Sequence, residues 1–180
     1  MYSQRNNGGV WMNDFYLALN DANKIIYEPH DLKIESIQEE KQNAKYGAGI
    51  FQLSSKTVRF RVANRTPTKI GQFVALWEKD CNRTNQPYIF DTSPDLFVIT
   101  TFFNDKEFGQ FIFPKEILVE KGILQSPSTK GKMAFRVYPI WDQPTSKQAK
   151  ETQKWQLTYF LDMRPSNDVP FETIKDLYNL

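Results

Sequence analysis

Short runs of β-branched and aromatic residues, separated by turn residues, constrain the fold of this chain more than any other feature. They are "GIFQL" (49–53), "TVRFRVA" (57–63), "GQFVALWE" (71–78), "LFVITTFF" (96–103), "EFGQFIF" (107–113) and "KMAFRVYPIW" (132–141). Such runs, bounded by Gly, Pro, Asn, Asp or Ser, are typical of strands. The turn "NDK" between the fourth and fifth runs predicts a hairpin. We therefore expect a curved antiparallel sheet.

Helical patterns lie on both sides of these runs. Apolar side chains recur at helical spacing from Phe15 to Ile26, which predicts a helix over residues 13–27. Further helices are expected at residues 115–121, where Gly122 ends the segment, at 144–160 and at 171–178. The pattern predicts one α+β domain over residues 11–180, with helices packed on the sheet, after a flexible tail at residues 1–10.

Charge is unevenly distributed, although the net charge is only +2. Residues 54–76 hold five bases and no acid. Acids instead concentrate in a stretch that we expect to be a linker, at Glu28, Asp31, Glu35, Glu39 and Glu40. Such a separation predicts one cationic face rather than a strong overall field.

Cysteine usage and hydropathy indicate the compartment. Cys81 has no partner in the chain for a disulfide, and the N-terminus lacks the charged start and apolar run of a signal peptide. No run of about 20 apolar residues is present. We expect a cytoplasmic protein that does not enter a membrane.

Motifs for the commonest catalytic sites are absent. His30 and Cys81 are single, so no Cys/His zinc cluster can form, and the chain has no GxSxG, GxxxxGK[ST] or HExxH motif. The sequence predicts no metal site and no cofactor, and it leaves open whether the protein is an enzyme.

Two arginines lie on one face of the run "TVRFRVA". Strand alternation places Val58 and Phe60 on one side and Arg59 and Arg61 on the other. Guanidinium groups about 7 Å apart repel each other unless acids or a bound anion lie between them. Either linker acids fold back onto this strand, or Arg59 and Arg61 line an exposed anion-binding face.

The segment "RTPTK" adds to this cationic group. Arg65 and Lys69 flank the hydroxyl of Thr68 and the turn amides around Pro67. Guanidinium groups, hydroxyls and turn amides commonly hold phosphate or carboxylate oxygens.

A second group lies in the C-terminal half. Arg136 precedes Trp141 and Asp142, and the following helix carries an amide-rich face with an indole. That face comprises Gln148, Thr152, Gln153 and Trp155. It favours either a satisfied internal hydrogen-bond network or a surface that stacks a planar ligand. We expect Trp155 and Gln148 to meet Arg136 and Trp141 in one pocket.

Several of these blocks together resemble a known family. "YGAGIFQL", "FRVANRTPTKIGQFVALWEKD", "GQFIFPKEIL", "GKMAFRVYP" and "KQAKETQKWQLTYF" occur in order over about residues 46–160 and are similar to the MepB family of small bacterial proteins. The resemblance implies a cytoplasmic protein of Firmicutes and carries over no catalytic residue.

Three functions remain open. The leading hypothesis is binding of an anionic planar ligand, foremost single-stranded nucleic acid or a nucleotide. The first alternative is a metal-dependent phosphodiester hydrolase of nuclease type that acts in stress or phage defence. It would hold Mg²⁺ on Asp91, Asp95 or Asp142 and use Lys69 or Lys115 as electrophile. The second is an interaction module for an acidic protein partner. The predicted ligand-binding residues are Arg59, Arg61, Arg65, Thr68, Lys69, Lys115, Arg136, Trp141, Asp142, Gln148, Thr152, Gln153 and Trp155.

Overall fold

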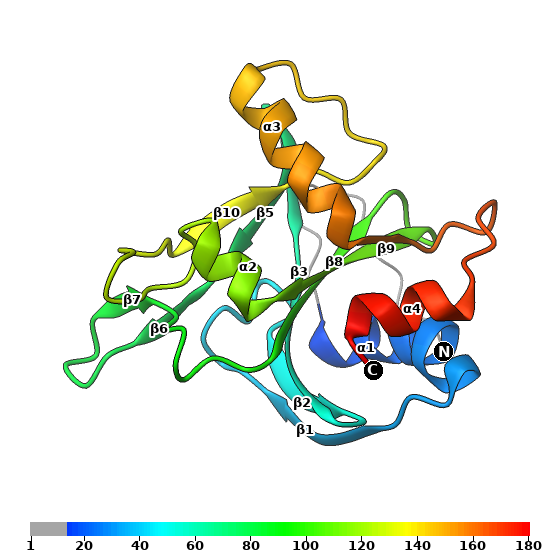
Figure 1. The fold of residues 1–180 in the computed structure, drawn as a ribbon, viewed down its shortest axis with the longest axis horizontal. Coiled ribbons are helices and arrows are strands. Elements are labelled where there is room, and N and C mark those ends of the chain that lie inside the picture. Colours follow the sequence, from blue (N-terminus) through cyan, green and yellow to red (C-terminus); the bar gives the residue numbers. More distant parts are fainter. Residues whose placement is uncertain (1–13) are drawn as a thin grey trace.

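A curved six-stranded sheet forms the centre of the fold in the computed structural model, which describes residues 14–180 (Figure 1). In spatial order its strands are β1 (Ile34–Glu39), β2 (Gly49–Leu53), β3 (Lys56–Val62), β8 (Leu96–Phe102), β9 (Phe108–Pro114) and β11 (Phe160–Asp162). A three-stranded sheet adds β10 (Ala134–Val137), β5 (Lys69–Ala75) and β4 (Asn64–Thr66), and a two-stranded ribbon adds β6 (Trp77–Lys79) and β7 (Asn85–Pro87). The expected flexible tail at residues 1–10 lies outside the described residues.

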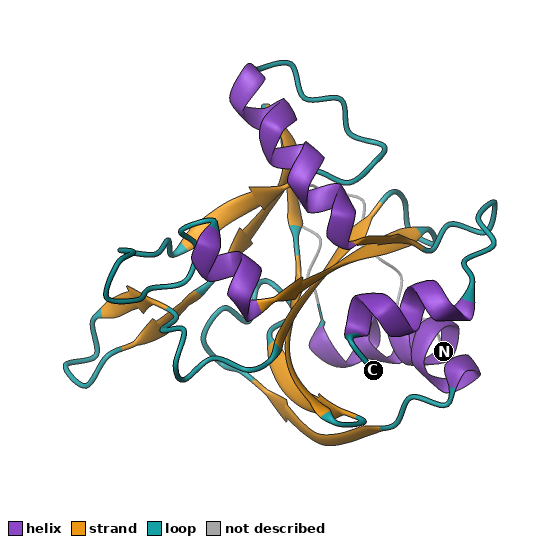
Figure 2. Ribbon diagram, viewed as in Figure 1, coloured by secondary structure: helices purple, strands orange, loops and turns teal. Residues whose placement is uncertain are grey.

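Helices cover both faces of the central sheet (Figure 2). They are α1 (Phe15–Ala22), α2 (Lys115–Glu120), α3 (Lys147–Gln156) and α4 (Phe171–Tyr178), with a π-helical turn at Asn23–Tyr27 and 3-10 turns at Glu28–His30 and Leu157–Tyr159. This arrangement confirms the expected α+β class. None of the helices within residues 14–180 is long and apolar enough to cross a membrane.

Two hydrophobic cores lie on opposite faces of the sheet. Leu96 and Val98 of β8 pack into the core that contains α1 and α4, whereas Phe97 and Ile99 pack into the core under α2. Because both faces of β8 are covered, its residues are buried from Leu96 to Thr101 and the strand shows no polar alternation.

One strand pair departs from the expected antiparallel order. β3 runs parallel to β8, with Val58 opposite Leu96 and Val62 opposite Thr100. The other neighbours in the central sheet are antiparallel. The chain between the two strands leaves the sheet to form β4 to β7, and it returns in the original direction. A hairpin cannot make such a connection, so the pairing is parallel.

Three further elements differ from the sequence expectation. The presumed acidic linker contains β1, and the "NRTPT" turn region contains β4. The helix expected over residues 144–160 is shorter, because Ser146 caps it by accepting from Ala149 N–H and β11 begins at Phe160. α4 matches the expected range of residues 171–178.

Candidate ligand-binding face

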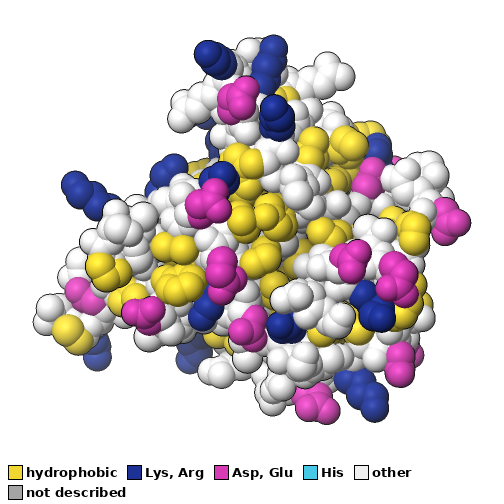
Figure 3. Space-filling view, viewed as in Figure 1, with side chains coloured by type: hydrophobic (Ala, Val, Ile, Leu, Met, Phe, Trp, Pro, Cys, Tyr) yellow, Lys and Arg dark blue, Asp and Glu magenta, His cyan; other side chains and the backbone are white. Residues whose placement is uncertain are grey.

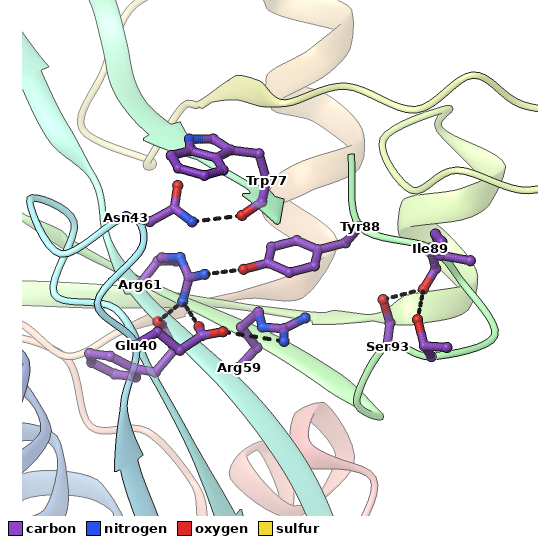
Figure 4. A network of polar contacts seen from close by, with 10 residues as sticks. Glu40, Asn43, Arg59, Arg61, Trp77, Tyr88, Ile89 and Ser93 are labelled. Atoms are coloured by element: carbon purple, nitrogen blue, oxygen red, sulfur yellow. Dashed lines mark hydrogen bonds and ion pairs between the residues drawn. The ribbon is translucent and has the colours of Figure 1, made fainter. Parts of the chain in front are cut away.

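Arg59 and Arg61 are buried rather than exposed, so the prediction that they line an open cationic face is wrong. Glu40, which follows β1, folds back over β3 and pairs with both (Figure 4). Its carboxylate oxygens lie 3.3 Å from Arg59 Nη2 and 2.7 Å from Arg61 Nη1. The alternative in which a linker acid folds back onto the strand is therefore the correct one.

Tyr88 closes this buried cluster. Arg61 Nη2 donates to the Tyr88 hydroxyl at 2.7 Å, and the Arg59 guanidinium lies 3.8 Å from the centre of the Tyr88 ring. Burial raises the pKa of Tyr88, and the positive charges of Arg61 and Arg59 oppose that rise. Two guanidinium groups share one carboxylate here. The cluster therefore fixes the segment that follows β1 onto β3.

The cations that remain near the surface lie on the β4–β5 hairpin. Arg65, Thr68 and Lys69 are exposed around its two-residue turn. Arg65 Nη2 donates to the carbonyl oxygens of Phe102 and Phe103 at the end of β8, the bond to Phe102 being 2.8 Å long. The guanidinium is thus fixed by neutral backbone acceptors.

Arg136 on β10 is held in the same way. It donates to the carbonyl oxygen of Gly71 at 3.0 Å and to the Thr66 hydroxyl at 2.9 Å, and it lies over the Phe73 ring. Among the described residues, neither Arg65 nor Arg136 is in an ion pair. These side chains form a preorganised group of positive charge.

Trp141 and Asp142 follow β10 and border this group. Burial raises the pKa of Asp142, while the charge of Arg65 and the N–H of Gly71 act in the opposite direction. One Asp142 carboxylate oxygen, Oδ2, and the Trp141 indole N–H are buried without a hydrogen-bond partner among residues 14–180. The charge of Arg65 thus acts on the Asp142 carboxylate, although the two side chains do not form an ion pair.

Two residues that sequence reasoning missed complete the border. Phe103, which is 40% exposed, meets Trp141 edge-on with ring centres 5.6 Å apart. Arg164 lies over both rings while pairing with Asp162 at 2.7 Å. Phe103 ends the apolar run 96–103, and its exposure depends on where the strand ends, which the run itself does not show. We call the surface of Arg65, Thr68, Lys69, Arg136, Phe103, Trp141 and Asp142 the cationic face.

The amide-rich face of α3 divides between two roles. Gln153 donates to the carbonyl oxygens of Pro139 and Asp142, and the buried Gln156 bonds the backbone of Tyr138 and Arg136. These amides form the internal network that was one of the two alternatives. They hold α3 against β10 and the loop that carries Trp141.

Gln148, Thr152 and Trp155 lie elsewhere, so the expected single pocket with Arg136 and Trp141 does not form. They line an open hollow of about 590 Å³ together with Lys121 and residues of the outer side of α3. Trp155 packs on Phe113, with ring centres 5.4 Å apart. The helix rotation that buries Gln156 against β10 turns Trp155 toward β9 instead of Trp141.

The residues named for the nuclease alternative are also dispersed. Lys115 contacts the Ser93 carbonyl oxygen at 3.4 Å and lies over the Phe90 ring. Asp95 accepts 2.8 Å bonds from the Thr57 N–H and hydroxyl, and the backbone bond lowers its pKa despite partial burial. Within residues 14–180, no three His, Cys, Asp or Glu side chains gather as a metal-binding group. Asp91, Asp95 and Asp142 are accordingly not a joint set of ligands.

Comparisons with known proteins place this fold. A family model described as MepB-like matches residues 40–162. The crystal structure of MepB superposes with a TM-score of 0.69 at 46% sequence identity, covering 72% of this chain and 86% of that one. A bacterial homing endonuclease covers 81% of this chain and 87% of its own at 13% identity and a TM-score of 0.42, a likeness too low to support an argument. No curated protein matches the sequence.

Proposed function

The chain belongs to the MepB-like family, and we propose that the cationic face of this member binds single-stranded nucleic acid. The observation that carries the proposal is the way Arg65 and Arg136 are held. Both guanidinium groups donate to carbonyl or hydroxyl oxygens, so among the described residues they are fixed in place without an ion pair, and the half-buried Asp142 carboxylate lies near Arg65. Fixed cations favour phosphate oxygens without the entropic cost of ordering a long side chain.

Two neighbouring features support a polymer rather than a lone anion. Lys69 extends the positive charge along the hairpin next to Arg65. Exposed lysines also lie on α3, and at the top of the molecule Figure 3 shows Lys and Arg side chains with an acidic side chain among them. Phe103 offers a partly exposed ring beside the cations. Positive charge along a path, combined with an accessible aromatic ring, is the usual arrangement for binding single strands.

The salt dependence of binding tests this proposal. Each phosphate contact contributes roughly 0.7 to the slope of log affinity against log salt for single strands. The double variant Arg65→Ala, Lys69→Ala should therefore reduce the slope by about 1.4, measured by fluorescence anisotropy with a labelled oligonucleotide. In the same titrations Phe103→Ala should leave the slope unchanged and weaken binding by about 1 to 3 kcal/mol if a base stacks on the ring.

A charge-matched control separates this site from general attraction. Lys24→Ala with Lys33→Ala removes two exposed lysines from the segment around α1 and β1 and lowers the net charge equally. This control should keep the wild-type slope. The proposal fails if both double variants change the slope alike, or if wild type shows no saturable binding at low salt. Adding Mg²⁺ and analysing strand length would show whether binding is accompanied by cleavage.

A further inference from the structure

A second surface lies between α1 and β1, outside the residues that the family model matches. A groove of about 560 Å³ runs there, lined by residues between Tyr16 and Ile37. The family match begins at residue 40, so this groove is built from the segment that precedes it. In Figure 1 β1 lies at the bottom edge of the central sheet, and α1 lies above it on the inner side of the curved sheet.

The groove exposes large apolar side chains. Tyr16 is 53% exposed and Ile37 is 47% exposed, and both line the groove together with Leu19 and Ile34. Contiguous apolar surface that stays exposed in a folded domain is typical of interaction sites.

An irregularity in β1 creates this lining. The register with β2 shifts between Glu35 and Gln38, and Ser36 has a φ of 53°. A bulge of this kind breaks the alternation of side chains and re-aims them. Ile34, Glu35 and Ile37 consequently all line the groove, whereas a regular strand would send neighbours to opposite faces.

The charge of the groove is negative. Of the described residues that line it, Glu28, Asp31 and Glu35 are acidic and Lys33 is basic. Among residues 14–180 none of these three carboxylates is in an ion pair. The groove thus combines exposed apolar side chains with acids that are in no ion pair among the described residues. None of its lining residues belongs to the cationic face.

We propose that this groove docks a basic segment of a partner protein. Aliphatic or aromatic side chains of that segment pack between Tyr16 and Ile37, and its Lys or Arg side chains pair with Glu28, Asp31 and Glu35. A second copy of this chain does not fit, because apposed β1 strands would bring like charges together. The bulge also disfavours adding a strand to this edge, so the segment is held by side chains.

Binding of a model peptide tests the proposal. The probe is a fluorescein-labelled peptide of alternating Lys and Leu, compared with a Glu and Leu peptide and with a Lys and Ser peptide. The Lys and Leu peptide should bind saturably, and both controls should bind at least about tenfold more weakly. Glu35→Lys and Ile37→Ser should each weaken the Lys and Leu peptide about tenfold while leaving the melting temperature unchanged, since both side chains are exposed.

The remaining outcomes are equally decisive. The Arg65→Ala, Lys69→Ala variant should bind the peptide as wild type does, which makes this result independent of the proposed nucleic-acid function. Equal binding of all three peptides, or unchanged binding to the Glu35 and Ile37 variants, overturns the proposal. So does a wild-type dimer in sedimentation analysis that Ile37→Ser dissolves, because the occupant is then a second copy.

Discussion

At the scale of single residues, Glu40 stabilises the buried positive charge of β3. Its carboxylate is the partner of two guanidinium groups, those of Arg59 and Arg61, whose residues are 8% and 0% exposed. Removing one member of a buried ion pair leaves the others charged and unpaired, which destabilises far more than the intact pair stabilises.

We therefore expect Glu40→Gln to lower the free energy of unfolding by about 3 kcal/mol or more, measured by urea denaturation at neutral pH. The amide keeps the shape of the side chain and removes only its charge. Glu39→Gln is the matched control, because Glu39 directly precedes Glu40 and is exposed. This substitution should change the free energy of unfolding by less than about 0.5 kcal/mol. Equal effects of the two substitutions would show that the buried guanidinium groups do not need the carboxylate.

These residues also show how far sequence reasoning reaches. Strand alternation correctly placed Arg59 and Arg61 on one face, because the period of two is local. Alternation does not say whether that face meets water, and the partner Glu40 is 21 residues away from Arg61. The hairpin cations Arg65 and Lys69 were easier to place, since turn residues lie at the surface.

At the scale of elements, the β4–β5 hairpin owes its shape to Gly71. Its φ is +85°, and a Cβ there would lie 2.6 Å from a ring atom of Tyr138 and 3.1 Å from the Val137 carbonyl oxygen. The Gly71 carbonyl oxygen accepts from Arg136, and the Gly71 N–H acts to lower the pKa of Asp142, so Gly71 joins the hairpin to two members of the cationic face.

Gly71→Ala should be more destabilising than Gly122→Ala in thermal unfolding. Gly122 at the end of α2 also has a positive φ, +69°, but a Cβ there meets nothing within 4 Å. The Gly122 variant measures only the destabilisation of about 1 kcal/mol that a positive φ causes at a non-glycine residue. The Gly71 variant adds the clash of the new Cβ with Tyr138. We also expect only Gly71→Ala to weaken oligonucleotide binding. Similar losses in both variants would mean that the ring of Tyr138 moves freely aside.

Elements with local signals were predicted well, and those fixed by distant contacts were not. α2 and α4 carry their own periodicity, and α2 also has its glycine stop, so their ranges match the structure closely. β1 was missed because only its first residue is even partly buried, which leaves no apolar alternation to detect. The parallel direction of β3 and β8 could not be found either, because strand direction is a property of the whole connection.

At the scale of the whole molecule, the π-helical turn after α1 and the distant helix α4 close one core together. The Tyr178 hydroxyl on α4 donates to the Gln110 side-chain oxygen at 2.7 Å. The Tyr27 hydroxyl lies 2.9 Å from the Tyr178 hydroxyl. Since Tyr178 donates to Gln110, Tyr27 donates to Tyr178. Burial raises the pKa of Tyr27 from 10.0 to about 12, and it raises that of Tyr178 as well.

Alkaline pH should consequently unfold the protein. The folded state holds these protons above pH 10, where an unfolded tyrosine loses them, so stability falls as pH rises from about 10 toward about 12. Tyr27→Phe should have a lower melting temperature than wild type near pH 8, because one hydrogen bond is lost, and a shallower decline above about pH 9. Tyr16→Phe, at an exposed site, should retain the wild-type profile. A Tyr27→Phe profile as steep as wild type would contradict this assignment.

The parallel pairing of β3 with β8 affects the order in which the chain can fold. The β8–β9 hairpin brings near neighbours together and can form early, whereas β3 must wait for residues 63–95 to be looped out. The length-dependent entropy of closing that loop is about 3 kcal/mol, and no contact between β3 and β8 offsets it until closure is complete. The strand pair that separates the two cores should thus assemble late, and until then the apolar edge of β8 is open to association with other nascent chains.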